Sequence, residues 1–153
     1  MPEPKERILS PHLLTFLLVE DDDNHAHLVM RSLQKARVQN RVFRVSDGAE
    51  ALAFLRSEGD FADTPHPDVV LLDLNLPKLS GHEVLAIIKQ DEHLKTIPVV
   101  VMTTSDAESD RVKAYEHHAN SYVVKPLDFD RFRELVRDLC LYWGVWNEPP
   151  EGE

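Results

Sequence analysis

The sequence has one cysteine, no long hydrophobic run and no cluster of basic residues. Its single cysteine, Cys140, cannot form an internal disulfide, which favours a reducing compartment, and we interpret it as a small inert thiol of the core. No apolar run approaches the roughly 18 residues that a membrane-spanning helix needs. Residues 1–12 form a proline-containing leader without the apolar segment of a signal peptide. We therefore expect a cytoplasmic protein that does not enter a membrane.

Basic charge is scarce as well, because 17 lysine and arginine residues face 27 aspartate and glutamate residues, giving a net charge of −10. Such an acidic surface repels nucleic acid and anionic lipid, so we expect no nucleic-acid partner. The 153 residues include 42% hydrophobic residues, enough for one domain that needs no disulfide or metal for its stability. We place this domain at residues 13–146 and a C-terminal tail at residues 147–153.

Five short apolar segments have the length and composition of β-strands, and a helical pattern follows each one. The expected strands are Thr15–Val19, Arg41–Val45, Asp68–Asp73, Ile97–Thr103 and Ser121–Lys125. Four are almost continuously apolar, as in central strands covered on both faces, whereas Arg41 and Arg44 mark the second as an edge strand. Alternating strands and helices predict an α/β fold. We predict a doubly wound, flavodoxin-like five-stranded parallel sheet in the order 2-1-3-4-5.

Polar residues that favour helix N-termini precede each helical pattern. They are Asp23 or Asn24, the Ser46–Gly48 turn, the Ser80–Gly81 pair, Ser105 or Asp106, and Asp128. Two pairs of histidines also stand in the predicted helices. We interpret His25 and His27, close to the acidic turn, as ordinary helix surface. His117 and His118 are adjacent, so in a helix they point in different directions and do not form a metal site.

Charged and hydroxyl side chains follow four of the five strands. These side chains are Glu20, Asp21, Asp22 and Asp23 after the first strand, Asp73 after the third, Thr103 and Thr104 at the end of the fourth, and Lys125 at the end of the fifth. Ligands of doubly wound sheets bind at the carboxyl ends of the strands. Carboxylates and water are the ligands that Mg²⁺ prefers, and an aspartate can itself accept a phosphoryl group. Acidic residues at such turns often only cap helices, but their concentration at one edge favours a phosphoryl-transfer site.

Four motifs carry a resemblance to a known family. They are VEDD at Val19–Asp22, LLDLNLPKLSG at Leu71–Gly81, VMTTS at Val101–Ser105 and YVVKP at Tyr122–Pro126. In this order and spacing they are highly specific, and from Thr15 to Trp143 the sequence resembles a response-regulator receiver domain of two-component signalling. The resemblance implies a phosphoacceptor signalling protein, not an enzyme, that uses Mg²⁺ for its own phosphorylation and dephosphorylation.

The resemblance also implies a role for each residue of the predicted site. Asp73 would be the phosphoacceptor, Asp21 a direct Mg²⁺ ligand and Glu20 a ligand that acts through water. Asn75 would give its backbone carbonyl to the metal, and its side chain would tune dephosphorylation. The metal set is thus Glu20, Asp21, Asp73 and Asn75.

Three further residues have implied roles beside the acceptor. Thr103 would bind a phosphoryl oxygen, and Lys125 would bridge the phosphoryl group to the carboxylates. Tyr122 occupies the position of the family's aromatic switch, so Thr103 and Tyr122 would move together on phosphorylation. The family commonly has a cis peptide bond before the proline that corresponds to Pro126.

Details of the sequence are similar to one subgroup, the small stand-alone regulators paired with bacterial phytochrome histidine kinases. These details include the run from Tyr115 to Tyr122 and the pair Tyr142-Trp143. Only a short segment follows, so we expect output through a partner, through self-association or through onward phosphotransfer. The expected phosphoryl donor is a sensor histidine kinase, and the expected switching surface lies near the fourth and fifth helices.

The last predicted helix has more apolar residues than one core-facing stripe needs. Phe129, Phe132, Val136, Leu139 and Trp143 share one face, which we assign to the core. Leu135, Tyr142 and Trp146 lie beside that face, and we assign them to a homodimer interface because exposed aromatic residues mark interfaces.

Three other functions remain open. A receiver whose acidic site only binds a partner would keep the fold without phosphotransfer. A phosphatase of the haloacid dehalogenase type needs a second aspartate two residues after the nucleophile, where this chain has Asn75. A flavodoxin-like electron carrier needs a phosphate-binding loop after the first strand, where four acidic residues stand instead.

Overall fold

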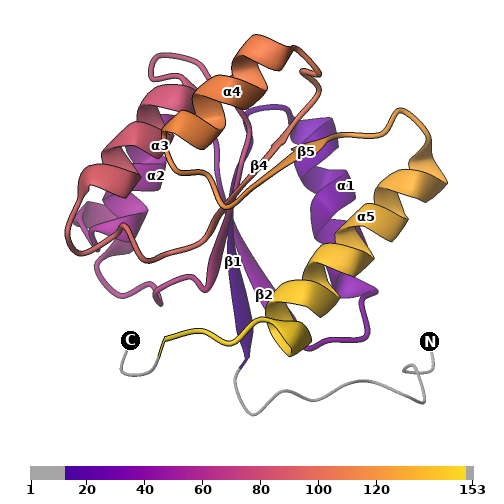
Figure 1. The fold of residues 1–153 in the computed structure, drawn as a ribbon. Coiled ribbons are helices and arrows are strands. Elements are labelled where there is room, and N and C mark those ends of the chain that lie inside the picture. Colours follow the sequence, from indigo (N-terminus) through magenta and orange to yellow (C-terminus); the bar gives the residue numbers. More distant parts are fainter. Residues whose placement is uncertain (1–12, 151–153) are drawn as a thin grey trace.

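The five apolar segments form one parallel sheet in the order β2-β1-β3-β4-β5, which confirms the predicted topology (Figure 1). The computed structural model describes residues 13–150, so the leader predicted at residues 1–12 and the last residues of the tail lie outside the described chain. The strands are β1 (Leu14–Val19), β2 (Asn40–Val45), β3 (Val69–Leu72), β4 (Val99–Thr103) and β5 (Ser121–Val124). The domain limits at residues 13 and 146 stay a prediction.

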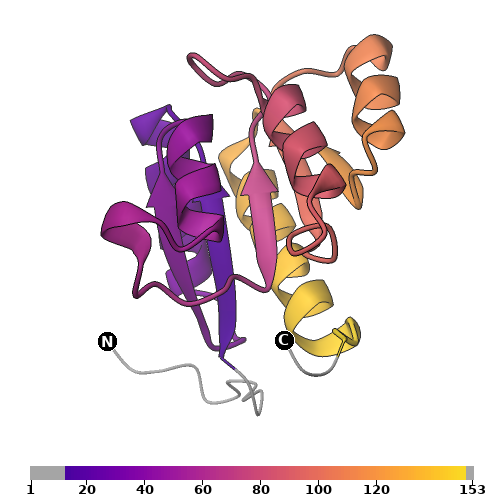
Figure 2. The same ribbon diagram turned by 90° about the vertical axis from the view of Figure 1, so that its left-hand side faces the viewer.

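Helices cover both faces of this sheet. They are α1 (Asp23–Gln34), α2 (Gly48–Leu55), α3 (Gly81–Gln90), α4 (Glu108–Glu116) and α5 (Phe129–Leu141), with a short 3-10 helix η1 (Gly59–Phe61) and a π-helical segment η2 (Tyr142–Trp146). Helices α1 and α5 lie on one face and α2, α3 and α4 on the other (Figure 1), the side that faces the viewer in Figure 2. None of the described helices is long and apolar enough to cross a membrane.

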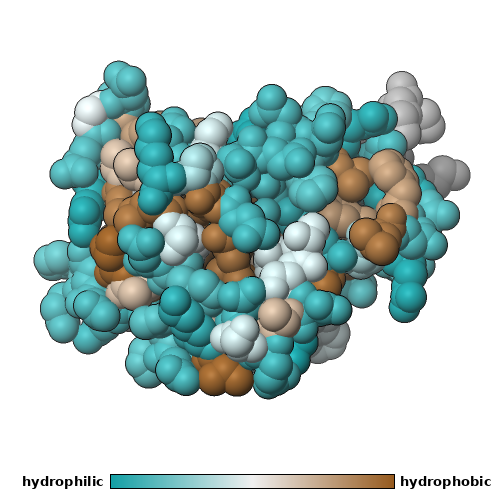
Figure 3. Space-filling model, turned by 90° about the horizontal axis from the view of Figure 1, so that it is seen from above, coloured by the Kyte–Doolittle hydropathy of each residue, from teal (hydrophilic) through white to brown (hydrophobic). Residues whose placement is uncertain are grey.

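Alternate residues of the strands supply two separate cores. In β1, Leu17 and Val19 pack toward α2 and α3, whereas Phe16 and Leu18 pack toward α1 and α5. Each of these four side chains is at most 1% exposed, as expected for a central strand covered on both sides. Hydrophilic residues cover most of the face seen in Figure 3, with apolar side chains exposed between them.

The edge strands and the last helix differ in part from expectation. Strand β2 lies at one edge of the sheet, as its arginines predicted, and β5 lies at the other edge. The residues of β5 are half-buried or exposed, so its apolar sequence does not mark a central strand. Phe129, which we had assigned to the core, is 57% exposed because it stands at the start of α5, ahead of the first buried residue of that helix, Phe132.

Side-chain caps fix where most of the helices begin. Asp47, Ser80 and Asp128 cap α2, α3 and α5, each accepting hydrogen bonds from the backbone of the first turn. The cap of α1 is Asp22 and not Asp23 or Asn24, because the Asp22 carboxylate accepts from the backbone N–H groups of the next turn.

Helix α4 starts at Glu108, later than predicted. Ser105 does not begin the helix because tertiary bonds hold it in a loop. Its hydroxyl donates to the Asp110 carboxylate at 2.6 Å, and its carbonyl oxygen accepts a hydrogen bond from the Tyr122 hydroxyl at 2.9 Å.

Candidate functional site

A buried cluster of charges lies where β1, β3 and β5 end. Glu20 directly follows β1, Asp73 directly follows β3 and Lys125 directly follows β5. All three side chains are at least nine-tenths buried. The ammonium group of Lys125 donates to Glu20 Oε1 at 2.5 Å and to Asp73 Oδ2 at 3.0 Å. The sheet thus brings together three of the residues that the sequence singled out.

Backbone contacts hold Asp73 in place on both sides. Its N–H donates to the Val19 carbonyl of the neighbouring strand at 3.1 Å, and its Oδ1 accepts from the Asn75 N–H at 3.0 Å. The first residue of α3, Gly81, packs so closely that a Cβ there would overlap the Asp73 carbonyl oxygen. The glycine therefore lets the helix lie directly against the backbone of Asp73.

Burial dominates the electrostatics of Glu20. It raises the pKa of this carboxyl from its ordinary 4.5 to about 7, and the negative charge of Asp73 acts in the same direction. The hydrogen bond from Lys125 opposes this rise and favours the carboxylate. Two buried carboxylates thus share one ammonium group, an arrangement that a further positive charge would stabilise.

The acidic rim offers ligands suited to a divalent metal ion. Asp21 is exposed beside the cluster, and no interaction of its carboxylate with another described residue is found. Carboxylate and carbonyl oxygens with open positions for water are the donor set of Mg²⁺ and Mn²⁺. Asp21, Asp73 and the Asn75 carbonyl supply donors of this type, whereas Asp22 is committed to capping α1.

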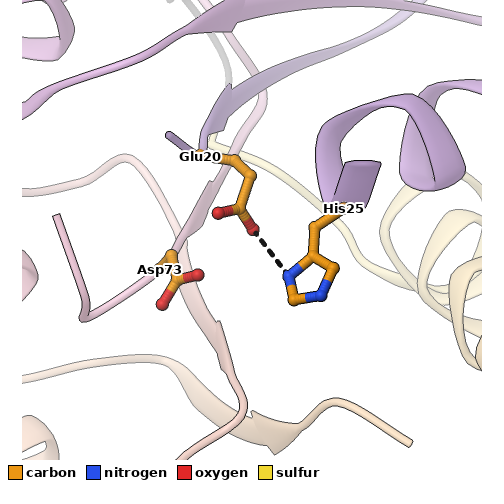
Figure 4. A group of neighbouring side chains, drawn as sticks. All are labelled: Glu20, His25 and Asp73. Atoms are coloured by element: carbon orange, nitrogen blue, oxygen red, sulfur yellow. Dashed lines mark ion pairs between the residues drawn. The ribbon is translucent and has the colours of Figure 1, made fainter. Parts of the chain in front are cut away.

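His25 also reaches this cluster, which the sequence interpretation missed. Its Nδ1 lies 3.0 Å from Lys125 Nζ and 3.9 Å from Glu20 Oε1. Figure 4 shows the ring on α1 pointing toward the Glu20 carboxylate, with Asp73 just beyond the end of the neighbouring strand β3. Glu20, His25 and Asp73 each offer one ligand atom within 4.8 Å of the others. The nearness of His25 in sequence to the acidic turn was the signal available.

The fourth strand delivers Thr103 beside this cluster. Thr103 is fully buried, its Oγ1 accepts from the Ser105 N–H at 3.4 Å, and its carbonyl accepts from the Lys125 N–H at 2.7 Å. No cis peptide bond occurs among the described residues, so the Lys125–Pro126 bond is trans and not cis as the resemblance implied.

A second polar network links Tyr122 to the loop that follows Thr103. The half-buried Tyr122 hydroxyl donates to the Ser105 carbonyl, and burial raises the pKa of this phenol. The Arg111 guanidinium stands 5.8 Å from the centre of the Tyr122 ring. The hydrogen bond from Ser105, and to a smaller extent the one from His82, lowers the pKa of Asp110. The loop 104–107 is therefore connected to β5, α3 and α4.

A doubly wound sheet that gathers two buried carboxylates and a buried lysine at its strand ends defines a receiver-type signalling domain. The chain belongs to the response regulator receiver domain family, whose model matches residues 16–137. It is 46% identical over 135 residues to the probable methanogenesis regulatory protein FilR2 of Methanothrix harundinacea (strain 6Ac), covering 88% of this chain and 86% of FilR2. It is 42% identical over 127 residues to the response regulator Rcp1 of Synechocystis sp. (strain ATCC 27184 / PCC 6803 / Kazusa), covering 83% and 86%.

Solved structures agree with this assignment. The phosphorylated cyanobacterial phytochrome response regulator RcpA superimposes with a TM-score of 0.87 at 40% identity, covering 92% of this chain and all of RcpA. The Mn²⁺-bound form of Rcp1 gives 0.84 at 39% identity, covering 90% and 99%. The chain is thus a two-component response regulator similar to Rcp1 and RcpA. Its family includes a member solved with a divalent metal ion, and its class implies a histidine kinase partner.

Proposed function

We propose that this chain accepts a phosphoryl group on Asp73 from a sensor histidine kinase, in the cytoplasm and with Mg²⁺. The observation that carries the proposal is the contact of one buried ammonium group with both Glu20 and Asp73. A buried lysine between two carboxylates at the ends of three strands neither caps a helix nor packs in the apolar core. It does suit a phosphoryl group that must have its charge neutralised.

In the proposed reaction, a carboxylate oxygen of Asp73 attacks the phosphorus of the donor. A bond forms between this oxygen and phosphorus while the bond from phosphorus to the donor nitrogen breaks, and the electron pair leaves with the donor imidazole. Lys125 donates to a phosphoryl oxygen, and Thr103 supplies a hydroxyl donor to another. Asp21, Asp73 and the Asn75 carbonyl would hold Mg²⁺, with Glu20 acting through water, and the ion would supply positive charge against which phosphoryl charge is neutralised.

Hydrolysis of the acyl phosphate would return the regulator to its first state. Asn75 is exposed two residues beyond the acceptor, a position from which its side chain can influence the approach of water. The Ser105 loop, bonded to both Thr103 and Tyr122, is the element that would report the phosphorylated state to the surface near α4 and α5.

The test is intact-mass measurement after incubation with Mg²⁺ and acetyl phosphate. Wild-type protein is expected to gain one phosphoryl group that is stable in acid and labile in base, and Asp73→Asn is expected to gain none. No gain in wild-type protein under conditions where Mg²⁺ binds would favour a receiver that only binds a partner.

A phytochrome-type kinase is the proposed donor, because RcpA, which is 40% identical to this chain, is a cyanobacterial phytochrome response regulator. The chain is also similar to FilR2, a probable methanogenesis regulatory protein, so the rate of transfer from a phytochrome kinase has to be compared with the rate from an unrelated kinase. Transfer from a radiolabelled phytochrome kinase that is at least tenfold faster than from an unrelated kinase is the expected result, and equal rates would contradict the pairing.

We further propose a homodimer through the end of α5 and η2. Tyr142 is 52% exposed and Trp146 is 74% exposed, whereas Leu135 is partly buried against the core that includes Val29 and Leu33 of α1. Exposed aromatic residues of this size favour an interface. Sedimentation is expected to show a dimer that Trp146→Ala weakens, and a monomer at tens of micromolar in both phosphorylation states would contradict it.

A further inference from the structure

The contact between His25 and Lys125 is not explained by any of the roles assigned so far. His25 lies in the first turn of α1, and its own N–H donates to the cap residue Asp22 at 3.1 Å. This bond fixes the start of the helix from which the ring projects. The His25 side chain is 38% exposed while the Lys125 side chain is 2% exposed. The imidazole therefore stands on the solvent side of a buried ammonium group.

The hydrogen-bonding capacity of Lys125 accounts for the arrangement. An ammonium group has three protons to donate and accepts none. Glu20 and Asp73 take two of these protons, and His25 Nδ1, at 3.0 Å, is placed to take the third. Because Lys125 only donates, Nδ1 must be the unprotonated nitrogen, and the proton of the neutral ring is on Nε2.

A metal ion held by Glu20, His25 and Asp73 together is a poorer interpretation of the same geometry. Lys125 Nζ lies within 3.0 Å of an atom of each of these residues. A cation bound to all three would have to displace the ammonium group and would meet its charge. The set proposed above, Asp21, Asp73 and the Asn75 carbonyl, does not include His25.

We propose that His25 is a positioning residue for phosphoryl transfer, which acts by holding the ammonium group of Lys125 beside Asp73. The inference rests on the proposed function of Asp73. When Lys125 turns one proton to a phosphoryl oxygen, Glu20 and His25 keep the other two in place. Without His25 the ammonium group has one fixed partner during the reaction and rotates toward water, so fewer molecules present it in the productive direction.

Side-chain geometry provides matched variants. Asn places an amide oxygen near the position of Nδ1, so His25→Asn retains an acceptor for Lys125. His25→Leu removes the acceptor at similar size. His27, exposed on the same helix, gives the control His27→Leu, which alters the helix surface without touching the cluster.

Two measurements together test the proposal. The first is the rate of phosphorylation by acetyl phosphate at saturating Mg²⁺. His25→Leu is expected to lower the maximal rate about tenfold or more, with little change in the half-saturating donor concentration, as loss of one hydrogen bond to a charged group implies. His25→Asn is expected to recover most of the rate, and His27→Leu to match wild type.

The second measurement is the NMR signal of the Lys125 ammonium group in unphosphorylated protein, assigned by its disappearance in Lys125→Met. A held ammonium group exchanges its protons slowly, so His25→Leu is expected to broaden or shift the signal and His25→Asn to restore it. If the signal in His25→Leu is the same as in wild-type protein, His25 does not have this role. The same holds if the signal is lost to the same extent in His25→Asn and in His25→Leu. Absence of phosphorylation in wild-type protein would instead overturn the function of Asp73, and the signal would still decide about His25.

Discussion

At the scale of single residues, Glu20 makes the folded protein sensitive to pH when no metal ion is bound. Burial raises its pKa from 4.5 to about 7, so the folded state holds a proton more firmly than the unfolded chain. Its contribution to stability is fully present below pH 4.5 and is lost as the pH rises through 7. The loss is on the order of 3 kcal/mol for a shift of this size.

Urea unfolding in EDTA at several values between pH 5 and pH 8 checks this effect. Wild-type protein is expected to lose stability over the interval, and Glu20→Gln, which carries no titrating group there, is expected to lose much less. If the stability of the two proteins changes with pH in parallel, the Glu20 carboxyl is not the cause of the pH dependence.

Cys140 is expected to be an unreactive thiol. It is fully buried, and burial raises its pKa to about 11, so the thiolate is about a hundredfold scarcer at pH 8 than for an ordinary thiol of pKa 9. Alkylation by iodoacetamide, followed by mass spectrometry, is expected to be slow in folded protein and complete within minutes in urea. Rapid alkylation of the folded protein would show that the end of α5 opens readily.

The sequence allowed the charged residues of the site to be predicted but not all of their contacts. Asp73 and Lys125 were identifiable because each directly follows an apolar strand, and parallel strands end at one edge. His25 was not, since its contact with Lys125 joins residues 100 positions apart. It depends on where the first turn of α1 lies relative to the Lys125 side chain, which no local pattern encodes.

At the scale of secondary structure elements, Gly81 decides how closely α3 approaches the acceptor strand. A Cβ at this position would overlap the backbone of Asp73 and Leu74. Alanine is intrinsically the better helix former by about 1 kcal/mol, but the overlap costs more. Gly81→Ala is therefore expected to destabilise the fold by about 2 kcal/mol or more and to slow phosphorylation.

The control for this variant is Gly59→Ala. Gly59 has a φ of +58° with open space around it, so alanine there meets backbone strain without overlap, at a cost of about 1 kcal/mol. Urea unfolding of both variants separates the two effects. If Gly81→Ala is as stable as wild-type protein or more stable, α3 can shift away from Asp73 without a cost in stability.

The element boundaries show where local patterns stop being sufficient. The caps Asp47, Ser80 and Asp128 were predicted because a cap depends only on neighbouring residues. The start of α4 was placed too early, since Ser105 is held by Asp110 and by Tyr122, which lies 17 residues further on. Phe129 was assigned to the core from helical spacing, which gives the face of a helix but not how far the sheet extends beneath it.

At the scale of the whole molecule, the strand order followed from connectivity rules, because right-handed crossovers leave few ways to wind five strand–helix units. The net charge of −10 acts at the same scale. An anionic donor such as acetyl phosphate must approach a rim where Asp21, Asp22 and Asp23 are all exposed. The field of the protein therefore opposes encounter at low salt, and added ions screen it over a distance of about 10 Å at 0.1 M.

We accordingly expect the second-order rate constant for acetyl phosphate, at saturating Mg²⁺, to rise about two- to threefold between 20 and 300 mM salt. Asp22→Asn removes one rim charge and keeps an oxygen that can cap α1, so it should raise the rate at low salt and flatten the salt dependence. Glu58→Gln removes an exposed charge just before η1 and should change both much less. If the rate instead falls with salt, attraction to Lys125 governs the encounter and the acidic rim does not.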